Sequence, residues 1–221
     1  MQKTYLALIS FGCIAQEFVQ AAGSAVVDYK TNGANWGDDY PLCKYGKEQT
    51  PINLTTRGYS TSPNMQLNGY AYQNMPRANV TRSANSINLN LSAGEFEIAF
   101  PDGSKSLFSP LQFHFHAPSE HSVDGKLYDL ELHIVHTYKD SPTSLGAVIG
   151  IFFDREKGGN YANPFLDSLA FGSTVLDTAV PVTNVNLANL LSSADFSRYW
   201  SYKGSLTTPP CTEGIKWSVL E

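Results

Sequence analysis

Charged residues are scarce in this chain of 221 residues. Asp, Glu, Lys and Arg make up 16% of it, the formal net charge is −5, and no run of Lys or Arg occurs. Proteins that bind nucleic acids usually present a basic patch, so we expect no nucleic-acid partner. No apolar stretch reaches the roughly 18 to 20 residues that a membrane-spanning helix needs, so we expect no transmembrane span. No feature of the sequence indicates an oligomeric state.

Stretches rich in Ala, Glu, Lys and Leu, which favour helices, are also few. Turn-forming residues are plentiful, with 17 Gly and 12 Pro, whereas hydrophobic residues still make up 42% and aromatic residues 12%. That apolar content is enough to bury a sizeable core. Length and composition therefore predict a single, mainly β (α+β) domain with many connections.

Short runs with strand-like composition predict five strands, separated by turn residues. They cover residues 86–91, 95–100, 111–116, 128–136 and 147–153. Pro101-Asp102-Gly103 and Asp124-Gly125 predict hairpin connections. Residues 163–171 and 187–193 predict short peripheral helices, and residues 28–64 are rich in loop formers. The pattern favours a mostly antiparallel β domain.

Residues 1–22 have the pattern of a secretory signal peptide. Lys3 is followed by the mostly apolar residues 4–15 and then by small residues at 21–24. We therefore expect a mature domain of residues 23–221 that is secreted, extracellular or within an organelle lumen, and not cytosolic. A buried N-terminal helix is the alternative interpretation of this segment.

Cysteine is scarce as well, with three residues, of which Cys13 lies in the predicted signal peptide. In an exported protein the remaining pair, Cys43 and Cys211, most simply forms one disulfide, and two buried free thiols are the alternative. Three N-glycosylation sequons agree with export through a glycosylating pathway. These sequons begin at Asn53, Asn79 and Asn90.

All five histidines fall between positions 114 and 136. His114 and His116 lie in a strand-like run, and residues two apart on a strand share a face. Gln112 therefore shares a face with both histidines, whereas Phe113 and Phe115 point to the opposite, apolar side.

A second strand-like run repeats this alternation, because Glu131, His133 and Val135 share one face. Pairing of the two runs would bring His133 beside His114 and His116. Three imidazoles on one sheet face can hold zinc with its fourth position open, as catalytic zinc sites do. An amphipathic strand without a metal is the alternative explanation of the His-x-His pattern.

Two further residues fit a zinc site, because a metal-bound imidazole usually donates its other N–H group to an acceptor. Gln112 and Glu131 each lie two residues from a candidate ligand and on its face. His136 points away from this face, which favours a buried, hydrogen-bonded structural role.

Six motifs occur in an order that is typical of one family. They are Trp36-Gly37, Gln49–Asn53, Gln112–His116, Ser119–His121, Glu131–His136 and Gly204–Pro210. With them the sequence resembles the α-class carbonic anhydrases of the secreted type. The resemblance implies a single domain around a large, mostly antiparallel twisted sheet, and reversible hydration of carbon dioxide to bicarbonate by attack of zinc-bound hydroxide.

The resemblance also implies individual roles. Zn²⁺ would be held by His114, His116 and His133, with Gln112 and Glu131 accepting hydrogen bonds from them. Thr207 would orient the hydroxide and donate its own proton to Glu120. The remaining implied roles are an apolar pocket of Val135, Val148, Leu206 and Trp217, bicarbonate contact by Thr208, a buried His121–Tyr202 hydrogen bond, and a Cys43–Cys211 disulfide.

Two departures from the family pattern are visible. Asn85 occupies the position where fast members carry a proton-shuttling histidine, which predicts slower turnover that rises with imidazole-type buffer. The chain ends at Glu221, where family members usually continue, so we expect the usual C-terminal segment to be lacking. A catalytically inactive binding or storage relative is the main alternative, although such proteins commonly lose a zinc histidine and this sequence has lost none. An unrelated zinc hydrolase acting on esters is another.

Overall fold

The structure is a computed structural model that describes residues 27–58, 66–83, 86–100, 102–157, 162–192, 194, 196 and 198–220. Two predictions fall outside the described residues, namely the signal peptide at residues 1–22 and the role of Asn85.

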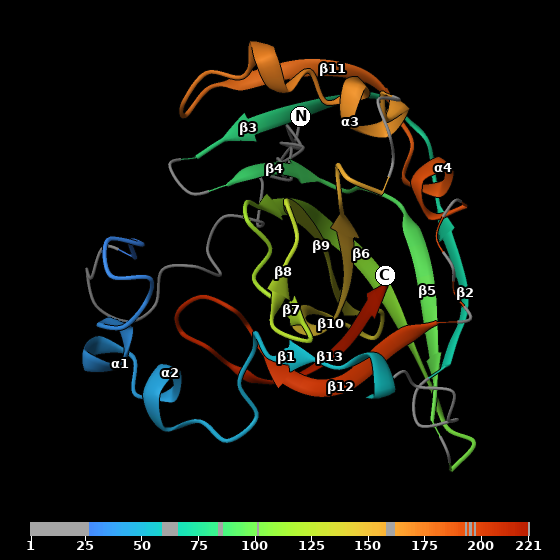
Figure 1. The fold of residues 1–221 in the computed structure, drawn as a ribbon. Helices are drawn as coiled ribbons and strands as arrows, with labels where there is room; N and C mark the ends of the chain where they lie inside the picture. The colour runs from blue at the N-terminus through green and yellow to red at the C-terminus, as the bar shows by residue number, and fades with distance from the viewer. Residues whose placement is uncertain are drawn as a thin grey trace, which may run out of the picture.

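A large twisted sheet dominates the described residues, which confirms the mainly β fold class (Figure 1). Its main path runs through β11 (Ala179–Val185), β3 (Met75–Arg82), β4 (Ile87–Asn90), β6 (Lys105–His116), β9 (Leu130–Tyr138), β10 (Ser141–Phe153), β13 (Glu213–Leu220) and β12 (Tyr199–Ser205). Beside this path, β5 (Gly94–Ala99) pairs with the first part of β6 and with β2 (Gln66–Tyr72).

Neighbouring strands of this sheet are antiparallel except at one described pair, β10 and β13, which run parallel. Figure 1 shows the C-terminal strand β13 beside β10, inside the sheet rather than at its edge. A small second sheet joins β1 (Asn53–Leu54), β7 (Ser122–Val123) and β8 (Lys126–Leu127). It ties the N-terminal segment to the residues that directly follow His121.

The helices are short and lie at the periphery of the sheet (Figure 1). They are α1 (Trp36–Asp39), α2 (Leu42–Tyr45), η2 (Thr56–Gly58), α3 (Pro164–Ser168), η3 (Phe171–Ser173) and α4 (Leu187–Leu191). Asn163 caps α3 by accepting from the backbone N–H groups of the first turn, and Asn186 caps α4 in the same way. In the part of the chain that the structure describes, no helix is long and apolar enough to cross a membrane.

The five predicted strands correspond to β4, β5, β6, β9 and β10. The strand predicted at 128–136 spans Leu130–Tyr138, because the backbone N–H and C=O groups of Tyr128 hydrogen-bond to Ser119 outside the sheet. Asp124 and Gly125 form the turn of the small β7–β8 hairpin. Both turn residues have positive φ angles, 48° and 83°, as a tight two-residue hairpin turn requires. Strands β2, β3, β11, β12 and β13 were not predicted from the sequence.

Alternating side chains of the central strands enter two separate apolar clusters. Phe113, Leu132 and Ile134 belong to the larger cluster on one face of the sheet. Val135 and Val148 belong to a smaller cluster on the other face. The predicted alternation of β6 and β9 is therefore confirmed, and it leaves the histidine face next to the smaller cluster.

Candidate functional site

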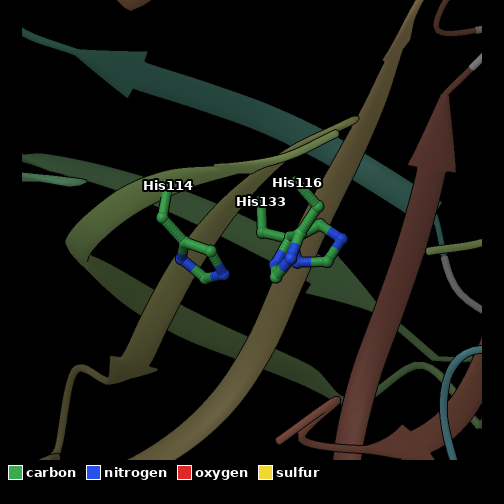
Figure 2. Close-up of side chains that lie close together, drawn as sticks. All are labelled: His114, His116 and His133. Atoms are coloured by element: carbon green, nitrogen blue, oxygen red, sulfur yellow. The ribbon is translucent and has the colours of Figure 1, made fainter. Parts of the chain in front are cut away.

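The register between β6 and β9 brings the three candidate ligands together. His114 lies directly opposite His133, and His116 lies opposite Glu131. Figure 2 shows the three imidazole rings close together, with those of His116 and His133 side by side. The ring centroids are 4.9 Å apart for His114 and His116, 5.2 Å for His114 and His133, and 4.7 Å for His116 and His133.

Two of the three histidines have a ring nitrogen at hydrogen-bonding distance from the expected acceptor. His114 Nδ1 lies 3.0 Å from Gln112 Oε1, and His133 Nε2 lies 2.8 Å from Glu131 Oε1. The other nitrogen of each ring is free to face the shared centre. One ring nitrogen from each of the three histidines lies within 4.8 Å of the others.

Glu131 is a fully buried carboxylate with four hydrogen-bonding neighbours. Its Oε2 accepts from the backbone N–H groups of Glu120 and His121, both at 2.9 Å. Its Oε1 lies 2.6 Å from His121 Nδ1 in addition to His133 Nε2. Burial alone would raise the pKa of Glu131, but His133 and the hydrogen bonds from His121 and His133 hold it well below its usual range.

The imidazoles are held in different electrostatic environments. Burial lowers the pKa of His114 well below its ordinary value and that of His116 to about 3, so both are neutral near pH 7. Burial acts in the same direction on His133, but the adjacent Glu131 carboxylate raises its pKa overall. Neutral imidazoles are the form that binds metals, and the buried carboxylate attracts positive charge to the same place.

Polar atoms near this centre lack partners. His116 Nε2 and Glu120 Oε2 are buried, 3.3 Å apart, and make no hydrogen bond. Buried polar groups are normally satisfied, so such atoms indicate that something else belongs there. Three convergent imidazole nitrogens, with the rings of His114 and His116 in the neutral form, fit a zinc ion.

Glu120 connects the histidine cluster with the loop that follows β12. Burial raises the pKa of this carboxyl group to about 7, while the charge of His133 and a hydrogen bond from the Thr207 side chain oppose the shift. The structure therefore brings Thr207 and Glu120 together, as the family resemblance implied.

A chain of hydrogen bonds leads from Glu131 to β12. His121 is fully buried, and its Nε2 lies 2.6 Å from the hydroxyl group of Tyr202. The ring of Trp217 packs against His121 and His133, with centroid distances of 5.0 and 4.8 Å. His121 and Tyr202 thus support the cluster from behind.

Four of the predicted pocket residues lie together in the structure. Val135, Val148 and Trp217 share the smaller apolar cluster, and the partly buried Leu206 packs against it. Thr208 lies in the same loop as Thr207, where its carbonyl oxygen accepts from the Cys211 N–H group at 2.9 Å. The loop is attached to α2 by a disulfide between Cys43 and Cys211.

His136 lies on the opposite face of β9, as predicted. It is fully buried, its Nε2 lies 2.7 Å from the Tyr72 hydroxyl group, and its ring packs 4.5 Å from that of Phe96. It takes no part in the cluster of His114, His116 and His133.

Two residues near the site were not singled out from the sequence. Asn88 lies opposite His114 on β4, and because its neighbour Leu89 is buried in the larger cluster, Asn88 shares the histidine face. The alternation of polar and apolar residues in 86–91 could have indicated this. Tyr29 lies near enough to Glu120 that burial and this carboxylate raise the pKa of its hydroxyl group to about 12. No local sequence pattern connects Tyr29 with Glu120.

Comparisons with known proteins identify the family. A family model described as eukaryotic-type carbonic anhydrase matches residues 31–221. The carbonic anhydrase of Pectobacterium carotovorum is 32% identical over 224 residues, which cover 99% of this chain and 84% of that protein. An α-carbonic anhydrase from Thermovibrio ammonificans, solved with the inhibitor sulfanilamide, has a TM-score of 0.72 and 30% identity, covering 90% of this chain and 84% of the other.

A dioscorin is also similar to this chain. Dioscorin DB3L of Dioscorea polystachya is 27% identical over 228 residues, covering 98% of this chain and 78% of that protein. A solved dioscorin complexed with ascorbate has a TM-score of 0.70 and 27% identity, covering 89% of this chain and 82% of the other. The match of the family model to residues 31–221, together with relatives at 30% identity or more over nearly the whole chain, shows that this protein belongs to the eukaryotic-type (α-class) carbonic anhydrase family.

Proposed function

We propose that this protein catalyses the reversible hydration of carbon dioxide to bicarbonate and a proton, with zinc held by His114, His116 and His133. The observation that carries the proposal is the convergence of three imidazoles, one nitrogen of each within 4.8 Å of the others. Gln112 and Glu131 fix two of these rings by accepting hydrogen bonds from their outer nitrogens.

When bound there, zinc supplies a Lewis acid that makes water a nucleophile near neutral pH, a property for which carbonic anhydrases are the standard example. The neutral imidazoles preserve the positive charge of the ion, whereas a carboxylate ligand would oppose this effect. The buried negative charge of Glu131 lies behind His133 and not among the three ligands. This arrangement makes the imidazole more basic without neutralising the metal directly.

The chain's own contribution to the reaction is the control of one proton. The Thr207 hydroxyl group donates to Glu120, so on its other side the same oxygen can accept a hydrogen bond but cannot donate one. The Thr207 oxygen therefore binds only a neighbouring group that can donate a hydrogen bond. By holding that group's hydrogen, it turns the group's lone pair toward the substrate. The Thr207 backbone N–H group is available to orient the substrate oxygen.

Carbon dioxide is uncharged and weakly hydrated, so an apolar surface can hold it without an ionic anchor. Val135, Val148, Leu206 and Trp217 offer such a surface beside the histidines. Thr208 offers a hydroxyl group to bicarbonate, which unlike carbon dioxide needs polar contacts. We assign these residues to substrate and product on that basis.

Export is part of the same proposal. The Cys43–Cys211 disulfide fits an oxidising compartment, in agreement with the sequence pattern of residues 1–22. The asparagines of the three sequons, Asn53, Asn79 and Asn90, are exposed, so glycans at these positions would meet no steric obstacle from the core. The domain we propose for this activity is residues 23–221.

The second candidate is a binding or storage protein without catalytic activity, which the similarity to dioscorins favours. The presence of all three histidines together with Gln112, Glu131, Thr207 and Glu120 supports the enzyme instead. A protein that only binds a ligand does not need Thr207 and Glu120 to fix the direction of a hydrogen bond.

Stopped-flow measurement of carbon dioxide hydration on the zinc-loaded mature domain tests the proposal. We expect catalysis that is lost on removal of zinc with a chelator and regained when zinc is restored. A His114→Ala variant should lose both tight zinc binding and activity. A folded protein that binds zinc but does not accelerate hydration would refute the enzyme and support the binding protein. Ester cleavage that outpaces hydration would indicate a hydrolase.

A further inference from the structure

The motif Gln49–Asn53 is one of the six that carry the family resemblance, yet none of its residues has a role in the proposed chemistry. We propose that Thr50 is a positioning residue: it fixes the position of the loop that carries Thr207 and Thr208 relative to the chain of hydrogen bonds that ends at His133. The inference rests on the proposed function, because it concerns how that site is held in shape.

Thr50 and Ser205 exchange two hydrogen bonds although they are 155 residues apart. The backbone N–H of Thr50 donates to Ser205 Oγ at 2.9 Å, and the backbone N–H of Ser205 donates to Thr50 Oγ1 at 3.0 Å. Both residues are buried, with exposed fractions of 6% and 0%. A buried N–H group that loses its acceptor is costly, so each side chain fixes the backbone of the other residue.

Thr50 also reaches the chain of hydrogen bonds that ends at the histidine cluster. Its Oγ1 accepts from the Tyr202 hydroxyl group at 3.1 Å, and that same hydroxyl group lies 2.6 Å from His121 Nε2. His121 in turn contacts Glu131, the acceptor for His133. One oxygen atom therefore joins the start of the Thr207 loop to the support of a zinc ligand.

The far end of the same loop is held by the residues just before Thr50. Gln49 Nε2 donates to the carbonyl oxygen of Cys211 at 3.2 Å and to Glu213 Oε1 at 3.0 Å. The backbone N–H of Glu48 donates to the same Glu213 oxygen at 2.7 Å. Glu48–Thr50 thus contacts the loop at its beginning, at Ser205, and at its end, at Cys211 and Glu213.

The fit around Thr50 is tight. A Cβ atom at Gly204 would lie 2.2 Å from Thr50 Oγ1, so only glycine allows this approach. On the other side of Ser205, its carbonyl oxygen accepts from Trp217 Nε1 at 2.9 Å. Thr207 follows only two residues later, so a shift of the backbone at Ser205 would move its hydroxyl group relative to Glu120.

The test compares Thr50→Val, which keeps the shape but removes the acceptor oxygen, with Thr50→Ser, which keeps the oxygen. Thr174→Val is the control, because it makes the same substitution at a distant threonine whose hydroxyl group is also hydrogen-bonded, by donating to the Phe171 carbonyl oxygen at 2.8 Å. Phe171 packs against Phe115 on the opposite face of β6, away from the histidines. Amide hydrogen exchange at Ser205, zinc content, and kcat and KM for carbon dioxide hydration are measured for each protein.

We expect Thr50→Val to bind zinc normally, to exchange the Ser205 amide faster, and to lose kcat/KM by roughly 10- to 100-fold, as a small misplacement of a catalytic group does. Thr50→Ser should restore slow exchange and most of kcat/KM, and Thr174→Val should match the parent protein. Equal defects in the valine and serine variants would overturn the proposal, as would a Thr50→Val enzyme with parental kcat/KM.

A second variant covers the case in which Thr50→Val does not fold. Ser205→Ala removes the acceptor for the Thr50 N–H group, together with the hydrogen bond that the Ser205 hydroxyl group donates to the Leu206 carbonyl oxygen at 2.8 Å. It should lower kcat/KM in the same direction, and parental kcat/KM would overturn the proposal. If the zinc-loaded parent protein does not hydrate carbon dioxide, the proposed function fails. Hydrogen exchange at Ser205 in the Thr50 variants then still decides whether Thr50 holds this loop.

Discussion

His136 makes the stability of the fold depend on pH through a group outside the catalytic site. The imidazole is fully buried, and burial lowers its pKa from 6.5 to about 3. The folded protein therefore keeps His136 neutral at pH values where the unfolded chain takes up a proton. Because the unfolded state binds more protons below about pH 6.5, this residue destabilises the fold progressively as the pH falls toward about 3.

The size of the effect follows from the two pKa values. At about pH 5 the proton uptake of the unfolded state costs about 2 kcal/mol, and the full difference, reached near pH 3, is about 5 kcal/mol. Replacing His136 by Phe removes this contribution and keeps a ring beside Phe96. It also removes the hydrogen bond with Tyr72, worth about 1 kcal/mol. His136→Phe should therefore be less stable than the parent by about 1 kcal/mol near pH 7.5 and more stable by about 1 kcal/mol near pH 5.

Urea unfolding of the zinc-free proteins at several pH values measures the free energy of unfolding of each, and so shows whether the order of the two stabilities reverses between pH 7.5 and 5. The other titrating groups are the same in both proteins, so their contributions cancel in the difference. Tyr72→Phe is the control, because it removes the hydroxyl group but leaves the histidine, and it should keep the pH dependence of the parent. Parallel stability curves for His136→Phe and the parent between pH 7.5 and 5 would refute the assignment of a buried neutral imidazole.

Three further predictions concern the site and its support. Glu131→Gln should weaken zinc binding by roughly 10- to 100-fold in chelator competition, because His133 loses a charged acceptor, and an unchanged affinity would contradict that role. Reducing the Cys43–Cys211 disulfide, which closes a sequence separation of 168, should lower the free energy of unfolding by about 5 kcal/mol on the loop-closure estimate. Equal urea midpoints before and after reduction would argue against it. With asparagine at position 85, hydration at low buffer should accelerate as imidazole is added, and a rate independent of imidazole would disprove the missing shuttle.

The parts of the fold that the sequence predicted are those with local alternation. β6 and β9 alternate apolar and polar residues, so both their faces and their pairing could be predicted before any coordinates. β12 and β13 lack so clear an alternation: the second half of β13 is buried on both faces, because Trp217 and Val219 lie in the smaller apolar cluster and Leu220 lies in the larger one. A parallel pairing between β10 and β13 also depends on contacts between distant segments, which a periodic pattern does not encode.

The histidine cluster could be predicted because strand geometry determines it. Side chains alternate with a period of two, so once His114 and His116 share a face with Gln112, only the register with β9 remains open. A shift of one residue in the pairing of β9 with β6 would point His133 into the larger apolar cluster, where Leu132 and Ile134 now lie. Burying an imidazole there without hydrogen-bond partners would be costly. Burial of those two residues therefore selects the register that also places His133 opposite His114.

The role of Thr50 could not be predicted in this way, unlike those of Gln112 and Glu131. Thr50 lies in a segment without regular structure. Its partner Ser205 follows it in the sequence only after most strands of the sheet. The two residues meet because β1 pairs with β7 and β12 pairs with β13, so both segments converge near the buried His121. These contacts consist of individual hydrogen bonds that leave no periodic pattern in the sequence. Strand periodicity therefore specifies which side chains could hold the metal, whereas long-range hydrogen bonds between Thr50 and the end of β12 determine how rigidly the loop after β12 presents Thr207.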